Sequence, residues 1–236
     1  MSSGMSRIAP ALLVALGVWI CGGDSAQADG GKKGSYPAAA SSQWSGFYVG
    51  AGIGSAWGDA TFDFQAVPPP PLSMDLDSTI AGGIFVGYQR QWGRIVGGIE
   101  AGALFTNAGG STTCVPGILF TCTVDVDWVL MIGPRLGMAS NNFHFYGTGG
   151  LAIGSLESRT VTTATGVVFD TGDGQHTGWY LGGGVEWNLT RAWVLGLEYR
   201  HIELGSDSHA SVPGSARDVE ATLNTLQARL TLKLGD

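Results

Sequence analysis

The sequence predicts an all-β protein, specifically an up-and-down antiparallel eight-stranded transmembrane β-barrel. Three observations support this fold class. Bulky apolar residues alternate with small or polar ones in eight segments, which is the period of a strand with one apolar face. The connectors between these segments alternate between long and short. Charged residues lie on the parity opposite the apolar residues, where only a barrel lumen would enclose them.

Composition narrows the class before any element is assigned. The chain has 236 residues, of which 44% are hydrophobic, 13% are charged and 39 are Gly. This is too apolar for a disordered chain and too rich in Gly for a helical bundle. With 12 Lys and Arg against 19 Asp and Glu the net charge is −7, so nucleic acid is excluded as a partner.

The first 28 residues are typical of a secretory signal peptide. An apolar run from Ile8 to Ile20 follows Arg7, and Ala26-Gln27-Ala28 offers small residues for cleavage before Asp29. Lipoprotein-type cleavage at Cys21 is disfavoured, because bulky residues precede that cysteine. The expected organisation is a signal peptide over 1–28, a periplasmic N-terminal linker over 29–43 and a β-barrel over 44–236.

The first four strands are expected where alternation is strict. Their apolar parities are Phe47, Val49, Ala51 and Ile53; then Ile80, Ile84, Val86 and Tyr88; then Ile95, Ile99, Ala101, Ala103 and Phe105; then Val124, Val126, Trp128, Leu130, Ile132 and Leu136. Gly and charged residues occupy most of the opposite parity. Each segment therefore predicts a strand with one apolar face.

The last four strands follow the same pattern. Their apolar residues are Phe143, Phe145, Leu151 and Ile153; then Trp179, Leu181, Val185 and Trp187; then Trp193, Leu195, Leu197 and Tyr199; then Leu226, Ala228, Leu230, Leu232 and Leu234. Aromatic residues near the short connectors also suit a membrane-interface girdle.

The connectors distinguish a membrane barrel from a soluble sandwich. Short connectors are expected at 91–94, 140–142 and 188–191, and long ones at about 58–78, 108–121, 158–176 and 205–218. Short periplasmic turns alternating with long extracellular loops are typical of outer-membrane barrels. The chain is therefore expected in the cell outer membrane.

The polar parity predicts a charged network inside the barrel. Its members are Glu100, Arg135, Glu186, Glu198, Arg200 and Arg229. Three acids and three guanidiniums can neutralise one another in a lumen that side chains fill, although buried ion pairs add little net stability.

Two cysteines remain after signal cleavage, Cys114 and Cys122. An exported chain meets an oxidising compartment, so a disulfide between them is expected at the tip of the second long loop.

Several short motifs of this chain resemble those of a known family. Trp44-Ser45-Gly46-Phe47-Tyr48-Val49-Gly50 behind a polar linker is similar to the first strand of the small outer-membrane immunogenic proteins, which are OmpA-like barrels of Gram-negative bacteria. The likeness continues through Phe85–Tyr88, Gly182–Trp187 and Leu197–Arg200. It implies surface antigens and envelope structure without catalytic chemistry.

Candidate chemical sites are weaker than this resemblance. His209-Ala210-Ser211 with Glu220 is superficially similar to the His-x-Ser pair and nearby acid of lipid A deacylases, but the triplet lies in a predicted loop and the Asn that usually follows is absent. Neither the histidines nor the loop aspartates show metal-ligand spacing: His144, His176, His201 and His209; Asp75, Asp77, Asp170 and Asp173. Pro68–Pro71 predicts a stiff polyproline segment in the first long loop.

The sequence thus favours a monomeric, non-enzymatic barrel with a structural or surface-antigen role and with no cofactor or metal. A narrow porin-like channel for small solutes is the first alternative, and a lipid A-modifying enzyme is the second. The expected partners are outer-membrane lipid and lipopolysaccharide, the barrel-assembly machinery during insertion, and an extracellular molecule that meets the loops.

Overall fold

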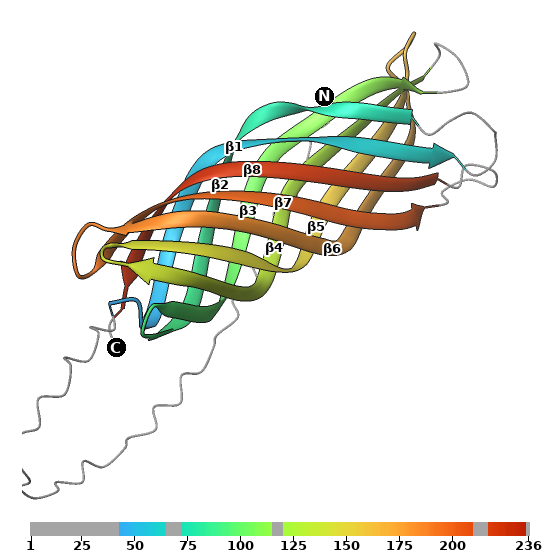
Figure 1. Cartoon of the computed structure of the whole chain (residues 1–236). Helices are drawn as coiled ribbons and strands as arrows, with labels where there is room; N and C mark the ends of the chain where they lie inside the picture. Colours follow the sequence, from blue (N-terminus) through green and yellow to red (C-terminus); the bar gives the residue numbers. More distant parts are fainter. Residues whose placement is uncertain (1–42, 65–71, 115–119, 210–216, 235–236) are drawn as a thin grey trace, which may run out of the picture. The chain divides into compact units, whose positions relative to one another are not determined.

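The computed structural model describes residues 43–64, 72–114, 120–209 and 217–234 (Figure 1). Eight antiparallel strands form a closed barrel in chain order, because β1 pairs with β8 as well as with β2. The strands are β1 (Gly46–Phe64), β2 (Leu72–Trp92), β3 (Ile95–Cys114), β4 (Phe120–Ser140), β5 (Phe143–Thr162), β6 (Val168–Asn188), β7 (Trp193–His209) and β8 (Arg217–Lys233). The predicted fold class is confirmed. The expected signal peptide over 1–28, nearly all of the linker over 29–43, and Pro68–Pro71 lie outside the described residues.

Three short turns join the strands at one end of the barrel. Trp92 pairs with Ile95, and Ser140 pairs with Phe143, so each of these turns has two residues. Gly93 and Asn141 adopt positive φ angles of 62° and 52°, a left-handed conformation that favours Gly and Asn. The third turn lies between Asn188 and Trp193. The three predicted short connectors are therefore in place.

The predicted long loops are wrong over most of their length, because the strands continue into them. The β1–β2 ladder reaches Phe62 paired with Leu72, and the β3–β4 ladder reaches Cys114 paired with Phe120. Strands of 17 to 21 residues exceed the roughly 9–11 that cross a bilayer. The barrel therefore has a turn-side half, next to the short turns, and a distal half formed by the strand extensions.

Irregular pairing in the middle of the strands interrupts the simple period of two. The strand extensions therefore cannot be recognised from alternation alone. Register shifts occur between Ala56 and Gly58, between Phe105 and Ala108, and between Val126 and Trp128. A β-bulge adds a residue to one strand and can move the following side chains to the other face.

One predicted face assignment is wrong for this reason. Val124 and Val126 were expected on the same face as Leu130 and Ile132. Both valines are fully buried, whereas Leu130 and Ile132 are about half exposed. The bulge beside Trp128 separates the two parts of β4 and reverses the alternation.

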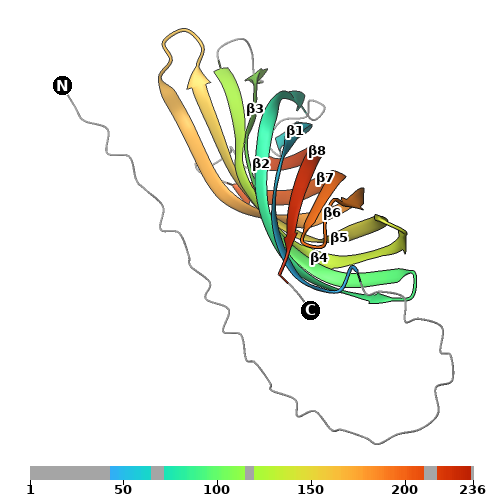
Figure 2. The same cartoon turned by 90° about the vertical axis from the view of Figure 1, so that its left-hand side faces the viewer.

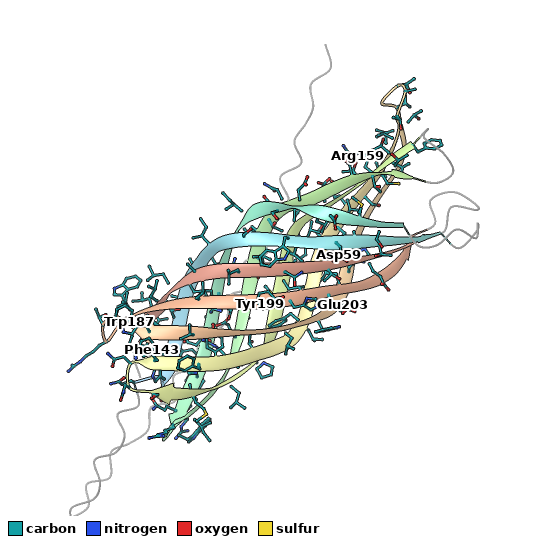
Figure 3. The ribbon with its side chains drawn as sticks, turned by 45° about the horizontal axis from the view of Figure 1, so that its top comes forward. Asp59, Phe143, Arg159, Trp187, Tyr199 and Glu203 are labelled. Carbon is teal, nitrogen blue, oxygen red and sulfur yellow. The ribbon has the colours of Figure 1, made fainter. Side chains whose placement is uncertain are left out.

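The two halves have opposite polarity. In the turn-side half of β7, Leu195 and Leu197 face outward, while Glu198 and Arg200 are buried inside. In its distal half Glu203 is exposed, while Ile202 and Leu204 are buried. Figure 3 shows the same change along the surface, from Phe143 and Trp187 near the turns to Asp59, Glu203 and Arg159 farther along. An apolar exterior suits lipid, and a polar exterior suits water.

The distal half also divides along two seams. The β2–β3 ladder ends at Gly82 paired with Phe105, and the β6–β7 ladder ends at Gly178 paired with Leu204. Beyond these pairs, the described residues pair only within β3–β6 and within β7, β8, β1 and β2. Two four-stranded sheets thus enclose the distal interior, and the β5–β6 hairpin projects from this end (Figure 2).

Apolar side chains from both sheets fill the space between them. The buried cluster is Ala56, Ala60, Met74, Leu76, Ala81, Leu104, Ala108, Cys122, Val124, Val126, Val129, Met131, Ala152, Leu156, Tyr180, Ile202, Leu204, Ala221 and Leu223. The distal half is therefore packed like the core of a soluble β-protein.

The exposed apolar side chains of the turn-side half form a band around the barrel, which is called the lipid-facing band, and its position can be tested on β8. Leu230→Arg should cost about 2–4 kcal/mol of the free energy of unfolding, because Leu230 faces outward in the middle of the band. Thr222 faces outward in the distal half, so Thr222→Arg should cost less than about 1 kcal/mol of the free energy of unfolding. Reversible urea unfolding in lipid vesicles measures both, and equal losses would contradict the assigned band.

The apolar interior of the distal half can be tested on β4. Val126→Asp should cost roughly 3–5 kcal/mol, because it places an unpaired carboxylate in the distal apolar cluster. The neighbouring change Asp125→Ala should alter the free energy of unfolding by no more than about 0.5 kcal/mol, because Asp125 is exposed. The opposite order would restore the face assignment predicted from the sequence.

Candidate functional site

The turn-side lumen holds the six charged residues singled out in the sequence. Glu100 comes from β3, Arg135 from β4, Glu186 from β6, Glu198 and Arg200 from β7, and Arg229 from β8. Each is no more than 7% exposed. Five different strands therefore direct their charges into one enclosed space.

Ion pairs connect all six side chains, which together are called the lumen network. Glu100 lies 3.3 Å from Arg135, 2.7 Å from Arg200 and 2.6 Å from Arg229. Glu198 pairs with Arg200 at 2.7 Å and also with Arg229. Glu186 pairs with Arg135 at 2.6 Å. Three acids thus balance three guanidiniums, which a low-dielectric interior requires.

Three further polar residues belong to the network, although sequence reasoning did not assign them to it. The Tyr48 hydroxyl donates to Glu100 at 2.9 Å, and the Tyr146 hydroxyl donates to Glu198 at 2.7 Å. His144 Nδ1 lies 3.1 Å from Glu186. Tyr48 and Tyr146 share a parity with lumen glycines, and this signal could have identified them.

Aromatic rings pack against the guanidiniums. The Arg135 guanidinium carbon lies 3.6 Å from the ring centre of Tyr146, and that of Arg229 lies 3.7 Å from the ring centre of Phe85. Such contacts stabilise a desolvated cation on the face of a ring. The network is therefore held by stacking as well as by hydrogen bonds.

Glycines make room for these rings. A Cβ at Gly87 would lie 2.3 Å from the Tyr48 hydroxyl, and one at Gly50 would lie 2.2 Å from Phe85. The small residues on the lumen parity of β1 and β2 are thus required by the size of their neighbours.

Apolar layers lie on both sides of the lumen network. Trp44, Val96, Ala139 and Val194 form a buried cluster toward the short turns. The distal apolar cluster lies on the other side. A polar solute crossing the barrel would meet both layers as well as the charges between them.

The three histidine side chains that the structure describes lie in different places. His144 joins the lumen network, His176 lies near Gly205 with its Nδ1 2.8 Å from that carbonyl, and His201 contacts Asn224 on the exterior. The side chain of His209 and all of Ser211 lie outside the described residues, so the His209, Ser211 and Glu220 candidate stays untested. Among the side chains that the structure describes, no three His, Cys, Asp or Glu residues are placed to hold a metal ion.

The cysteines lie near the distal end of β3 and β4. Cys122 is disulfide-bonded, and it pairs in register with Thr112, while Cys114 pairs with Phe120. Cys114 is therefore diagonal to Cys122 in the same ladder. The side chain of Cys114 lies outside the described residues, so its bond with Cys122 stays a prediction.

The exterior of the distal half is strongly acidic. Among the side chains described there, the exposed charged residues are Asp59, Asp75, Asp77, Asp125, Asp127, Glu157, Glu203 and Glu220, against Arg159. Asp75 and Asp77 are exposed on β2, and the side chains of Asp170 and Asp173 lie outside what is described. By contrast Arg90, Arg94 and Arg191 are exposed near the short turns.

The sequence of this chain is similar to those of known outer-membrane proteins. A family model described as an outer membrane protein beta-barrel domain matches residues 34–233. The 31 kDa outer-membrane immunogenic protein of Brucella melitensis is 28% identical over 80% of this chain and 83% of its own length. A 22 kDa outer membrane protein of Rhizobium leguminosarum is 29% identical over 76% of this chain and 73% of its own length.

Solved structures share the fold alone. The outer membrane protein OprG of Pseudomonas aeruginosa has a TM-score of 0.51 at 11% identity, covering 79% of this chain and 96% of that one. The outer membrane protease OmpT of Escherichia coli has a TM-score of 0.50 at 8% identity, covering 80% and 96%. Among the described residues, no helix is long and apolar enough to cross a membrane.

The lumen network can be tested through its most connected acid. Glu100→Gln should cost about 3–5 kcal/mol of the free energy of unfolding, because three guanidiniums lose part of their compensation. Glu186→Gln should cost less, because Glu186 pairs with one arginine and with His144. Urea unfolding in vesicles gives both values, and a smaller loss for Glu100→Gln would show that the network is not centred on Glu100.

Proposed function

Since the chain belongs to the outer membrane protein beta-barrel domain family and is an outer-membrane protein, we propose that it is a non-enzymatic, non-conducting barrel with a surface role. In this proposal the turn-side half anchors the chain in lipid, and the distal half extends into the cell exterior. The lumen network, enclosed between two apolar layers, is the observation that carries the proposal.

The lumen argues against the channel alternative. A conducting pore needs a continuous aqueous path, but Arg135, Arg200 and Arg229 cross the interior to reach acids on other strands. An eight-stranded barrel is only wide enough for side chains to fill it. Any solute would have to separate these ion pairs and then enter the apolar interior of the distal half.

The distal half supports a surface role. It has a polar exterior over a dry apolar core, so it can hold a defined shape in water without lipid. The matched Brucella protein is called immunogenic, and we extend an antigenic role to this chain as part of the proposal. An extracellular molecule would meet the paired strands of this half together with the connectors at its tip.

The non-enzymatic role and the monomeric state are the remaining parts of the proposal. The matched relatives are named for their place in the membrane and not for a reaction, which favours a non-enzymatic role. The protease OmpT shares only the fold. Closure of β1 on β8 satisfies the ladder within one chain, which favours a monomer. Insertion by the barrel-assembly machinery is the route that we propose for such a barrel.

Conductance recordings test this function. Purified protein in planar lipid bilayers should give no stable, well-defined current steps, because the lumen network fills the pore. Glu100→Ala combined with Glu186→Ala should raise any leak, because it removes the acids that hold the arginines in place.

The matched control is Glu157→Ala combined with Glu203→Ala, which removes the same charge from the exterior. This control should leave the membrane as tight as the natural protein does. A steady unitary conductance from the natural chain would establish the channel alternative in place of the proposed function.

A further inference from the structure

An ordered group of polar and aromatic side chains lies on the exterior where the apolar band ends. It crosses β6, β7, β8 and β1, and its members are Trp179, Tyr199, His201, Glu203, Asn224, Trp57 and Asp59. The register places His201 beside Asn224 and Asn224 beside Trp57. The next row away from the turns contains Trp179, Glu203, Thr222 and Asp59. This group is called the boundary patch.

Hydrogen bonds fix the centre of the boundary patch. Tyr199 donates its hydroxyl to Asn224 Oδ1 at 2.8 Å, and His201 Nδ1 lies 2.9 Å from the same oxygen. An amide oxygen only accepts, so His201 donates from Nδ1 in this contact. The His201 ring and the Asn224 side chain are only partly buried, so a ligand can reach both of them.

Aromatic rings surround this centre. Trp57 lies 6.4 Å from Tyr199, and Trp179 lies 5.7 Å from His201, measured between ring centres. Tyr199 and Trp179 are 43% and 45% exposed, so their rings are available to a ligand. Figure 3 shows Tyr199 between the turn end and Glu203, with Asp59 close to Glu203 along the barrel. Two carboxylates thus border a set of rings and hydrogen-bonding groups.

The position of the patch identifies what it meets in the membrane. Toward the turns, the next exterior residues are Leu197, Ala228 and Ile53, which suit acyl chains. Farther from the turns the exterior becomes acidic. The patch therefore lies at the level of lipid headgroups, in the leaflet opposite the short turns.

We propose that the boundary patch binds a sugar ring in the headgroup of an outer-leaflet glycolipid. Sugar rings present an apolar C–H face that packs on aromatic rings and hydroxyls that exchange hydrogen bonds with amide, imidazole and carboxylate groups. The patch supplies all of these on a rigid sheet. The headgroup acts as a ligand that the folded barrel recognises, which goes beyond the anchoring that any girdle of aromatic residues provides. This inference needs the outer-membrane location, but not the absence of conduction.

Binding to a rough-type lipopolysaccharide, which consists of lipid A and inner-core sugars, tests the proposal. The full protein is folded in detergent micelles, and its affinity for this lipopolysaccharide and for phosphatidylglycerol is titrated. Tyr199→Phe combined with Asn224→Leu nearly keeps the size of both side chains and removes their hydrogen-bonding groups. This double variant should lose roughly tenfold in affinity for the lipopolysaccharide, and its affinity for phosphatidylglycerol should be unchanged.

The matched control makes the same chemical changes at the opposite membrane boundary. Tyr88→Phe combined with Asn188→Leu should leave both affinities unchanged, because these residues lie near the short turns. If the double variant of the patch does not fold, His201→Leu replaces it and should give a loss in the same direction.

Two outcomes would overturn the proposal. Unchanged affinity for the lipopolysaccharide in the patch variants would show that the hydrogen-bonding groups are not used. An equal loss for the lipopolysaccharide and phosphatidylglycerol would show that the patch holds lipid without recognising sugar. Neither outcome bears on the bilayer recordings, which test the proposed function separately.

Discussion

Closure of the sheet on itself is the constraint from which the other features of this molecule follow. Lipid offers no partner for backbone N–H and C=O groups, so the strands that cross it must satisfy one another around a complete ring. Pairing of β1 with β8 completes that ring. A ring of eight strands encloses an interior that is only wide enough for a few side chains. Those side chains must fill the interior without leaving a net charge there. The balanced lumen network and the glycines that admit Tyr48 and Phe85 are the result.

The exchange of polarity between the two halves shows how one sheet can meet two solvents. Pairing continues along the strands from the turn-side half into the distal half, but the solvent outside changes from lipid to water. In β7 the outward residues change from Leu197 to Glu203 and the inward ones from Glu198 to Leu204, with no change in the direction of the strand. In β4 a bulge shifts the register at the transition. The two seams then allow the distal half to pack as two facing sheets.

The sequence predicts the architecture well because the lipid-facing band has a strict period of two. The eight strands, their order and the three short turns all follow from that period and from Gly93 and Asn141. The burial of six charged side chains follows from their parity. Contacts such as Tyr48 with Glu100 depend on the stagger between strands, which no local pattern contains. The strand extensions escaped prediction because polar exterior residues and bulges resemble a loop when they are read one residue at a time.

The extended pairing of the distal half determines how an antibody would recognise it. Side chains that adjoin on this surface come from remote parts of the chain: Glu203 on β7 lies beside Thr222 on β8, which lies beside Asp59 on β1. An epitope that covers this row is discontinuous and exists only while the barrel is folded. Short linear peptides cannot reproduce it, so an antibody raised against such peptides would not bind this row of the folded barrel.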